Sequence, residues 1–435
     1  MIIQFAVGNY LSFDEVTVLQ MITKSKETLF EKSDVIDNKT YKILKNVSIF
    51  GSNASGKTSF VKAISFFKNA LIDNDTYLKA ASKYCRIKNE NKNSPSIFEI
   101  VLDIGNRFFQ YGFSVILSEG TVVDEYLYEI TPSTFGSKPI FSRKDNMINV
   151  SLNKNLLLTV KGKLTEAINN NKLFLSLICK DKTFDNVDGI KNIIEVYRYI
   201  INKIIVINKD TKSNYLLRNE INKNYVDILN NFDFNISAIN KKDIDEDTIR
   251  TIIGSQTYNR IRDDLLNDIK ANVITLYNSD NIYLFSKSDN GINTKKIIFK
   301  HFHSDSEFST NEESDGTNRI MDLIPILFVE EEATFFIDEI ESSLSSDMVI
   351  HFIETLRTYN NPVQLIFTTH ADRLFDDKYL RRDAMFIVEK DNLGASHLKR
   401  VSQFKGIYSE KNINSKYLQN RYGGRPNIIG VNNKA

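Results

Sequence analysis

The sequence predicts an α/β fold with a mixed β N-terminal lobe, a parallel-sheet core built around a phosphate-binding loop, and a helical insertion. Two observations lead to this prediction. The β-prone run Val47–Phe50 leads into a glycine-containing loop, and apolar residues then recur at a helical period. A second apolar, β-prone run, 333–337, ends far along the chain in an Asp-Glu pair. A strand, loop and helix followed by a distant acidic strand end is typical of a parallel sheet that binds ligands at its carboxyl edge.

The composition is that of a globular protein. The chain has 435 residues, 42% of them hydrophobic, and a formal net charge of +1 from 56 basic and 55 acidic side chains. This balance gives no overall field that favours nucleic acid. The N-terminus lacks a signal-peptide pattern and no apolar run approaches the length of a membrane span, so we expect a cytoplasmic protein without a membrane partner. Cys85 and Cys179 form no C-x-x-C pair, as expected of buried thiols in a reducing compartment.

Four regions are expected along the chain. Residues 1–160 contain short β segments, the loop and three aromatic, β-branched runs separated by turns, which predict an antiparallel meander. Residues 161–280 have apolar residues at helical spacing and predict a helical insertion. Residues 281–410 return to strands and contain a second cluster of motifs. Residues 411–435 have few apolar side chains after Tyr422, and we expect a surface tail.

The loop itself fits the phosphate-binding pattern G-x-x-x-x-G-K-[ST]. Gly51 and Gly56 let the backbone turn its N–H groups inward, and the helix N-terminus adds partial positive charge. Lys57 is expected to contact the β- and γ-phosphates of ATP as a catalytic residue, and Thr58 to hold Mg²⁺ through its hydroxyl. The residues expected to bind the nucleotide here are Gly51, Ser52, Asn53, Ala54, Ser55, Gly56, Lys57, Thr58 and Ser59.

Two further strand ends are expected to complete the catalytic set. Ala333–Ile337 has the pattern of a buried parallel strand, and it leads into Asp338 and Glu339. Asp338 is expected to hold Mg²⁺ through water, and Glu339 to orient and polarise the attacking water. His370 ends the next apolar run, where its imidazole can donate a hydrogen bond to the γ-phosphate. One helix fits between the two strands, which predicts a βαβ unit.

A second anion site is expected at the run Glu313-Ser-Asp-Gly-Thr317, which directly precedes a helical segment. Ser314 and Gly316 would place a hydroxyl and free backbone N–H groups at a helix N-terminus. The chain would then carry two phosphate sites for one nucleotide.

These motifs, in this order, resemble those of ABC-type ATPases of the SMC, RecF and OLD kind. The matching stretches are GSNASGKT, ESDGT, FFIDEIESSL and FTTH. The resemblance implies an ABC-ATPase-type head that binds and slowly hydrolyses ATP with Mg²⁺. It also implies a head-to-tail homodimer or higher oligomer, in which Ser314 of one subunit caps ATP bound to the loop of the other.

Further motifs resemble the RloA-like and abortive-infection ATPases of phage-defence operons. They are Asn9-Tyr-Leu-Ser-Phe13, Pro95-x-x-Phe98-Glu99, Glu389-Lys-Asp391 and Asn420-Arg-Tyr-Gly-Gly-Arg-Pro426. This resemblance implies a nucleotide-driven switch that controls a separate, nuclease-like effector protein. Two positions depart from ABC patterns: residues 343–346 are Ser-Leu-Ser-Ser where the group commonly has Ser-Leu-His-Pro, and Asp315 replaces the first glycine of the usual ABC signature, as it does in this group.

Other functions remain as alternatives. A RecF- or SMC-like DNA-binding clamp in DNA repair has the same fold, and a basic C-terminal run would be its contact to nucleic acid phosphates. The basic residues of that run are Lys399, Arg400, Lys405, Lys411, Lys416, Arg421 and Arg425. A small-molecule kinase would use the same loop but has no need of the ESDGT run or of His370. His301 and His303 are interpreted as polar residues of a strand, and Asn9 and Phe13 are candidates for adenine contacts.

Overall fold

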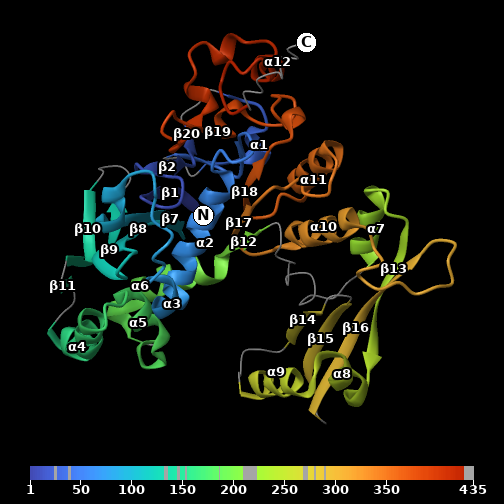
Figure 1. Ribbon diagram of the computed structural model, residues 1–435, viewed down its shortest axis with the longest axis horizontal. Coiled ribbons are helices and arrows are strands. Elements are labelled where there is room, and N and C mark those ends of the chain that lie inside the picture. Colours follow the sequence, from blue (N-terminus) through green and yellow to red (C-terminus); the bar gives the residue numbers. More distant parts are fainter. Residues whose placement is uncertain are drawn as a thin grey trace, which may run out of the picture. The chain divides into compact units, whose positions relative to one another are not determined.

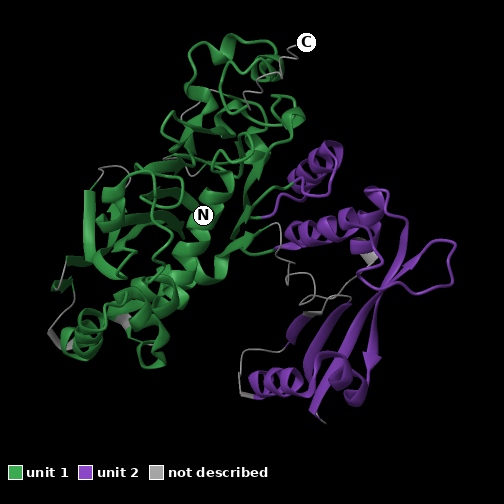
Figure 2. Cartoon of the chain, viewed as in Figure 1, with its two compact units in different colours: residues 1–209, 330–340, 362–435 green, residues 210–329, 341–361 purple. Residues whose placement is uncertain are grey.

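The computed structural model of the protein describes residues 1–23, 27–37, 41–131, 136–144, 147–151, 154–185, 187–208, 223–267, 273–278, 281–288 and 291–425. The chain forms two compact units (Figure 2). Unit 1 comprises residues 1–209, 330–340 and 362–435, and unit 2 comprises residues 210–329 and 341–361. The phosphate-binding loop, Asp338, Glu339 and His370 therefore belong to unit 1, whereas Ser314 and Gly316 belong to unit 2.

The centre of unit 1 is a six-stranded sheet in the order β12-β17-β18-β6-β19-β20. Its strands are β12 Ile204–Ile207, β17 Ala333–Ile337, β18 Val363–Thr369, β6 Asn46–Phe50, β19 Met385–Lys390 and β20 Ser396–Arg400. The first five strands run parallel, and β20 pairs antiparallel with β19. Every residue of β6, β17 and β18 is buried, which explains their apolar sequences. The predicted parallel core is confirmed.

A seven-stranded antiparallel sheet forms the β lobe of unit 1, in the order β11-β10-β9-β8-β7-β1-β2 (Figure 1). Its strands are β1 Ile2–Gly8, β2 Thr17–Gln20, β7 Ser96–Ile104, β8 Arg107–Ile116, β9 Thr121–Thr131, β10 Gly136–Lys144 and β11 Met147–Val150. Strands β7, β8 and β9 are the meander predicted from the aromatic and β-branched runs. A three-stranded sheet, β3-β5-β4, accompanies it, with β3 Ile22–Thr23, β4 Val35–Asp37 and β5 Lys42–Leu44.

Helix α2, Lys57–Ile72, joins these sheets in one core (Figure 1). On the side of the antiparallel sheet, Phe60 and Phe67 contact Phe5 with ring centroids 5.7 and 5.8 Å apart, and Phe67 stacks on Phe113 at 5.6 Å. The helix also contacts β12 and β18 of the parallel sheet. The helix that leaves the phosphate-binding loop therefore packs against both sheets.

The described part of unit 1 contains further helices, of which α4 is as long as α2. They are α1 Glu31–Asp34, α3 Asn74–Tyr77, α4 Lys154–Asn169, α5 Phe174–Lys180, α6 Lys191–Lys203 and α12 Ile413–Leu418, with 3₁₀ turns η1 Asn89–Asn93, η2 Lys182–Phe184, η3 Asp188–Ile190, η6 Asp372–Leu374, η7 Arg382–Ala384, η8 Val401–Gln403 and η9 Ile407–Ser409.

A buried carboxylate holds the start of α5: Glu125 accepts hydrogen bonds from the backbone N–H groups of Phe174 and Leu175. Burial raises the pKa of Glu125 despite these bonds.

Unit 2 consists of an antiparallel four-stranded sheet and helices. The sheet has the order β13-β16-β15-β14, with β13 Ile236–Ile244, β14 Val273–Asn278, β15 Asn281–Ser288 and β16 Gly291–His301. The helices are α7 Lys223–Asn231, α8 Glu246–Ile253, α9 Ser255–Asn267, α10 Asp315–Leu323 and α11 Ser346–Tyr359, with the 3₁₀ turn η5 Ile324–Phe328. A small core around Tyr258 and Phe285 holds α8 and α9 against the sheet.

The prediction for residues 161–280 needs correction, because this range is not helical throughout. It contains the greater part of α4 and helices α5 to α9, but also strands β12, β13 and β14. Strand β12 follows α6 directly and joins the parallel sheet beside β17. Its residues, Ile204–Ile207, continue the apolar run of α6, so the periodicity of the sequence did not separate the two elements.

The predicted surface tail also needs correction over its described part. Ile413, Tyr417 and Tyr422 are buried, and α12 packs within unit 1. Residues 426–435 of the predicted tail lie outside the described residues.

A single buried amide ties the three sheets of unit 1 together. The Gln364 side chain, on β18, accepts hydrogen bonds from the Ile2 N–H at 2.9 Å and the Thr334 hydroxyl at 3.1 Å. It donates to the carbonyl oxygens of Ile2 and Leu44, both at 3.0 Å. These partners belong to β1, β17 and β5. One side chain therefore provides hydrogen bonds to backbone groups of two other sheets.

We expect Gln364→Leu to lower the free energy of unfolding by on the order of 3 kcal/mol, because it leaves several buried backbone groups without a partner. Urea unfolding followed by circular dichroism measures the change. Gln419→Leu, at an exposed position, is the matched control and should stay close to wild type. Equal stability of the two variants would contradict the structural role of Gln364.

Candidate functional site

The phosphate-binding loop spans the end of β6 and the start of α2. Gly51, Ser55 and Lys57 are buried, while Asn53 and Ala54 form its exposed tip. Gly56 is the residue before α2 and has φ 120°, a left-handed conformation that favours glycine. The loop thus reverses within a few residues and delivers the chain into a helix, as the motif predicts.

The two glycines of the loop are required for different reasons. A Cβ on Gly51 would come within 2.6 Å of the Val388 carbonyl oxygen and 2.5 Å of the Ser55 hydroxyl, so there is no room for a side chain at this position. A side chain on Gly56 would collide with Ser396 and would also be strained by the positive φ. Strand β19 and the start of β20 therefore pack directly against the loop, a contact that the sequence did not indicate.

Ser396 fixes the loop by hydrogen bonds. Its hydroxyl donates to the Ser55 carbonyl oxygen at 2.6 Å, and its N–H donates to the Ser12 carbonyl oxygen at 2.7 Å. One residue at the start of β20 thus joins the phosphate-binding loop to the turn 9–13 near the N-terminus.

Lys57 points back into the loop. Its ammonium donates to the carbonyl oxygens of Gly51 at 2.6 Å and Ser52 at 3.1 Å, and the side chain is buried. Thr58 and Ser59 follow in the first turn of α2 and are half-buried. The loop therefore brings an ammonium group, two hydroxyls and a helix N-terminus to one place, a combination suited to a polyphosphate.

Asp338, Glu339 and His370 leave the parallel sheet at the same edge as Gly51. Strands β17, β18 and β6 are parallel neighbours, and their register pairs Thr369 directly with Phe50, the residue before Gly51. Because the carboxyl ends of parallel strands meet at one edge, the structure brings the loop and the two predicted strand ends together. Asp338 is buried, Glu339 half-buried and His370 exposed.

Thr368 organises the acidic pair, and the sequence analysis missed it. Its hydroxyl donates to the Asp338 carboxylate at 2.7 Å and accepts the N–H of Glu339 at 2.8 Å. Glu339 has φ 47°, a conformation that costs a non-glycine residue about 1–3 kcal/mol and that the neighbouring contacts must hold. The one available signal was a hydroxyl residue in an apolar strand, two positions before His370.

The predicted second anion site lies in unit 2. Ser314 is the N-cap of α10, and its hydroxyl accepts the Thr317 N–H at 3.0 Å. A Cβ on Gly316 would lie 3.0 Å from the Ser343 carbonyl oxygen, so the turn after Glu339 approaches this helix closely. The structure places Ser314 and Gly316 at a helix N-terminus, as the sequence predicted, but in a different unit from the loop.

His301 and the Ser-Leu-Ser-Ser stretch, both noted in the sequence, have structural roles in unit 2. His301, read as a polar strand residue, pairs with Glu313 at 2.7 Å, immediately before Ser314. In the unusual Ser-Leu-Ser-Ser stretch, Ser345 is the N-cap of α11 and accepts the N–H of Met348 at 3.3 Å. This stretch therefore starts a helix.

Asn9 and Phe13, the candidates for adenine contacts, have other roles. The Asn9 amide donates to the carbonyl oxygens of Asn91 and Ser94 and accepts the N–H of Cys85. Phe13 is fully buried against Phe60 of α2. Both side chains are used inside the fold, and the assignment is corrected.

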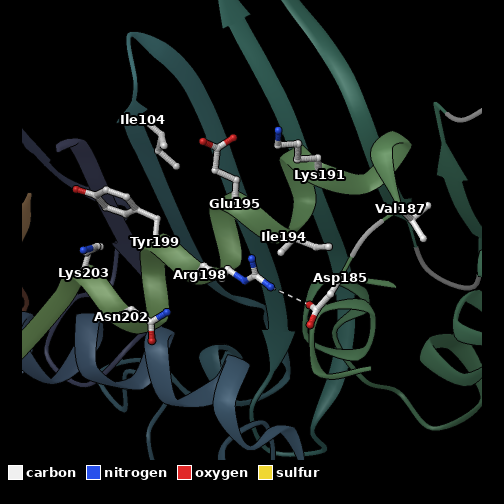
Figure 3. A pocket seen from close by; sticks show the side chains of 10 residues that line it. All are labelled: Ile104, Asp185, Val187, Lys191, Ile194, Glu195, Arg198, Tyr199, Asn202 and Lys203. Atoms are coloured by element: carbon white, nitrogen blue, oxygen red, sulfur yellow. Dashed lines mark hydrogen bonds and ion pairs between the residues drawn. The ribbon is translucent and has the colours of Figure 1, made fainter. Parts of the chain in front are cut away.

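A cavity of about 640 Å³ lies along α6 and is separate from the residues above (Figure 3). Its walls come from α6 along its whole length, from the end of β7 and from the segment just before α6, and none of its lining residues belongs to the phosphate-binding loop. Several of its charged side chains form ion pairs: Arg198 with Asp185 at 2.8 Å, as Figure 3 shows, Glu195 with Arg107 at 3.6 Å, and Lys203 with Glu331.

Within the described ranges, no helix has both the length and the apolar composition needed to cross a membrane. No curated protein matches the chain. Among solved structures, the chain is similar to "Crystal structure of the SmcHead bound to the C-winged helix domain of ScpA", with TM-score 0.39 and 10% identity over 92% of this chain and 96% of that one. It is also similar to "SMC head domain from Thermotoga maritima", with TM-score 0.33 and 11% identity over 92% of this chain and 98% of that one.

A family model matches residues 47–376. The match begins inside β6, before the phosphate-binding loop, and ends after His370, so it includes every motif of the candidate site. The chain belongs to the family described as "AAA domain, putative AbiEii toxin, Type IV TA system".

Proposed function

We propose that this protein binds and hydrolyses ATP as an ABC-type switch in anti-phage defence, and that it controls a separate effector protein. The observation that carries the proposal is the meeting of four groups at one sheet edge: the phosphate-binding loop, Asp338, Glu339 and His370. The family supports an AAA-type nucleotide-binding domain, and its description supports a role in abortive infection.

The loop serves as the phosphate cradle. Its backbone N–H groups and the N-terminus of α2 bind phosphate oxygens, and Lys57 adds a positive charge from inside the loop. Its ammonium already lies against the loop, at 2.6 Å from the Gly51 carbonyl oxygen, so it needs little movement to reach a bound phosphate. This pre-arrangement lowers the entropy cost of binding.

Glu339 and His370 act at the phosphoryl group. Glu339 orients the attacking water and accepts its proton, and His370 donates a hydrogen bond to the γ-phosphate. Thr368 is a positioning residue, because its hydroxyl holds both the Asp338 carboxylate and the Glu339 backbone.

The donor set also fits Mg²⁺. Among the described residues no group of three or more His, Cys, Asp or Glu side chains forms a site of its own. Magnesium in nucleotide sites needs only one or two protein oxygens beside the phosphates, and the Thr58 hydroxyl and the Asp338 carboxylate would hold it. When bound, the ion supplies positive charge that offsets the charge of the phosphates.

Ser314 and Gly316 complete the site in a second subunit. They lie at the N-terminus of α10, where backbone N–H groups and a hydroxyl are available to an anion. A head-to-tail dimer would bring this helix end to the ATP of the partner and make closure depend on the nucleotide. The effector, which we propose to be nuclease-like, would respond to that closure.

A DNA clamp is the second candidate, but three of the seven cations of the basic C-terminal run are held within the fold. Lys399 pairs with Glu389, Arg425 pairs with Asp372 at 2.6 Å, and Arg400 donates to backbone carbonyls of β2 and β3. These cations have partners within the fold and are less available to phosphates. DNA binding that weakens steeply between low and moderate salt would support the clamp instead.

Lys57→Ala should lower ATP affinity by roughly a hundredfold, because it removes the charge inside the phosphate cradle. Glu339→Gln should keep ATP binding and lower turnover by roughly a hundredfold or more, because it removes the proton acceptor. Fluorescent-nucleotide binding and phosphate release measure the two effects. Lys62→Ala, an exposed lysine on the same helix, is the control; wild-type turnover by Glu339→Gln would refute the assignment of Glu339.

Thr368→Val should lower turnover by roughly tenfold with little change in ATP affinity, because the acidic pair loses its common hydrogen-bond partner. Thr368→Ser keeps the hydroxyl and should recover most of the activity. The comparison needs only steady-state kinetics on the two variants. Equal activity of the valine and serine variants would show that the hydroxyl has no role.

Mixing Lys57→Ala subunits with Ser314→Arg subunits should restore activity that neither variant has alone, because a mixed dimer contains about one intact shared site. Titrating one inactive variant into the other and measuring ATPase activity tests this. Mixtures that stay as inactive as their components would argue against sharing of the site between subunits.

A further inference from the structure

The C-terminal segment 413–425 touches both the phosphate-binding loop and the segment that follows His370. This contact could not be foreseen from a stretch with so few apolar residues. Both of the contacted segments belong to the candidate site, so residues 413–425 are in a position to influence it. We call residues 413–425 the C-terminal clamp.

Aromatic rings anchor the clamp. Tyr417 stacks on Phe375 with centroids 4.1 Å apart and planes at 10°, and Tyr422 lies 5.3 Å from Phe404. Tyr417 is 1% exposed, and burial raises the pKa of its hydroxyl, so the ring stays neutral. Stacked and buried rings of this kind hold a short segment firmly.

The clamp contacts the end of β6 and the first glycine of the phosphate-binding loop. Phe50, the residue before Gly51, contacts the ring of Phe375 at 4.9 Å and the ring of Tyr417 at 6.0 Å. At the other end of the clamp, Gly424 has φ 79°, and a Cβ there would lie 3.7 Å from the Cα of Gly51. The nearest atom to such a Cβ belongs to the Ile387 side chain, at 2.5 Å, so Gly424 packs against β19 and close to the first glycine of the loop.

The clamp also holds the segment after His370 through one residue. The Asn414 amide donates to the Asp372 carbonyl oxygen at 2.6 Å, and the Arg425 guanidinium donates to the Asp372 carboxylate at 2.6 Å. Arg425 also lies over the ring of Tyr417, 5.9 Å from its centroid. Asp372 is two residues past His370, so both its backbone and its side chain are bound by the clamp.

We propose that the C-terminal clamp sets the position of His370 relative to the phosphate-binding loop, and that Asn414 and Arg425 are positioning residues for ATP turnover. The inference rests on the proposed ATPase function. His370 is exposed at the end of β18, and the chain beyond it turns at once into η6. Because the clamp contacts the loop at one end and Asp372 at the other, it fixes the distance between the His370 imidazole and the phosphate-binding loop.

The clamp should also respond to nucleotide. Phosphate binding adds contacts to the loop, and Gly424 of the clamp lies close to Gly51, its first glycine. Because the clamp packs on the loop, a nucleotide that stabilises the closed form of the loop also stabilises the packed form of the clamp.

The test is the kinetics of Arg425→Ala, with Arg421→Ala as the matched control. Arg421 is an exposed arginine in the same segment. We expect Arg425→Ala to lower kcat roughly tenfold while the affinity for ATP stays within about twofold, because the loop and Lys57 remain. A role in stability alone would lower the melting temperature without this separation of kcat from affinity. Asp372→Arg combined with Arg425→Asp restores an ion pair and should recover part of the lost kcat.

Hydrogen exchange on the wild-type protein is the second measurement, and it needs no variant to fold. Residues 413–425 should exchange more slowly with a non-hydrolysable ATP analogue bound than without it. Unchanged exchange in this segment, or wild-type kcat in Arg425→Ala, would overturn the clamp and leave the ATPase proposal intact. A wild-type protein that neither binds nor hydrolyses ATP would overturn both.

Discussion

The parallel register of three strands is the constraint on which the rest of the structure depends. Strands β17, β18 and β6 pair so that Thr369 lies opposite Phe50, which sets the loop and the two strand ends at one level. A shift of one residue would turn the side chains of a fully buried strand to the opposite face of the sheet. The site can tolerate strain at Glu339 because backbone hydrogen bonds hold the residues on either side of it: the Asp338 N–H donates to the Ile207 carbonyl oxygen at 2.9 Å and the Ile340 N–H to the Thr368 carbonyl oxygen at 3.1 Å.

Contacts from outside β17, β18 and β6 hold the loop in place. Val388 and Ser396 approach the loop from β19 and β20, and Gly424 approaches from the C-terminal clamp. The need for glycine at two positions of the loop therefore arises from close packing against these neighbours as well as from phosphate binding. A phosphate-binding loop packed on several sides is stiff, and a stiff loop can transmit the arrival of a ligand to the segments that touch it.

Much of the site could be predicted from the sequence, because its motifs are local. The loop, the acidic strand end and the strand-end histidine each occupy a few consecutive residues, and the meander follows from aromatic and β-branched runs. Thr368, Ser396 and the clamp were missed, since their roles arise from packing between distant segments. Strand β12 was missed for a different reason: it continues the apolar pattern of α6 without a turn signal.

The sheet order has a consequence for how the protein folds. Strand β6, at residues 46–50, lies between β18 and β19, whose residues are 363–369 and 385–390. Neither neighbour of the phosphate-binding strand exists on a ribosome until most of the chain has been made. Such non-local pairing closes slowly, and β6 would wait as an unpaired apolar strand. Early synthesis can complete the meander, whereas the nucleotide site must assemble among the last parts of the fold.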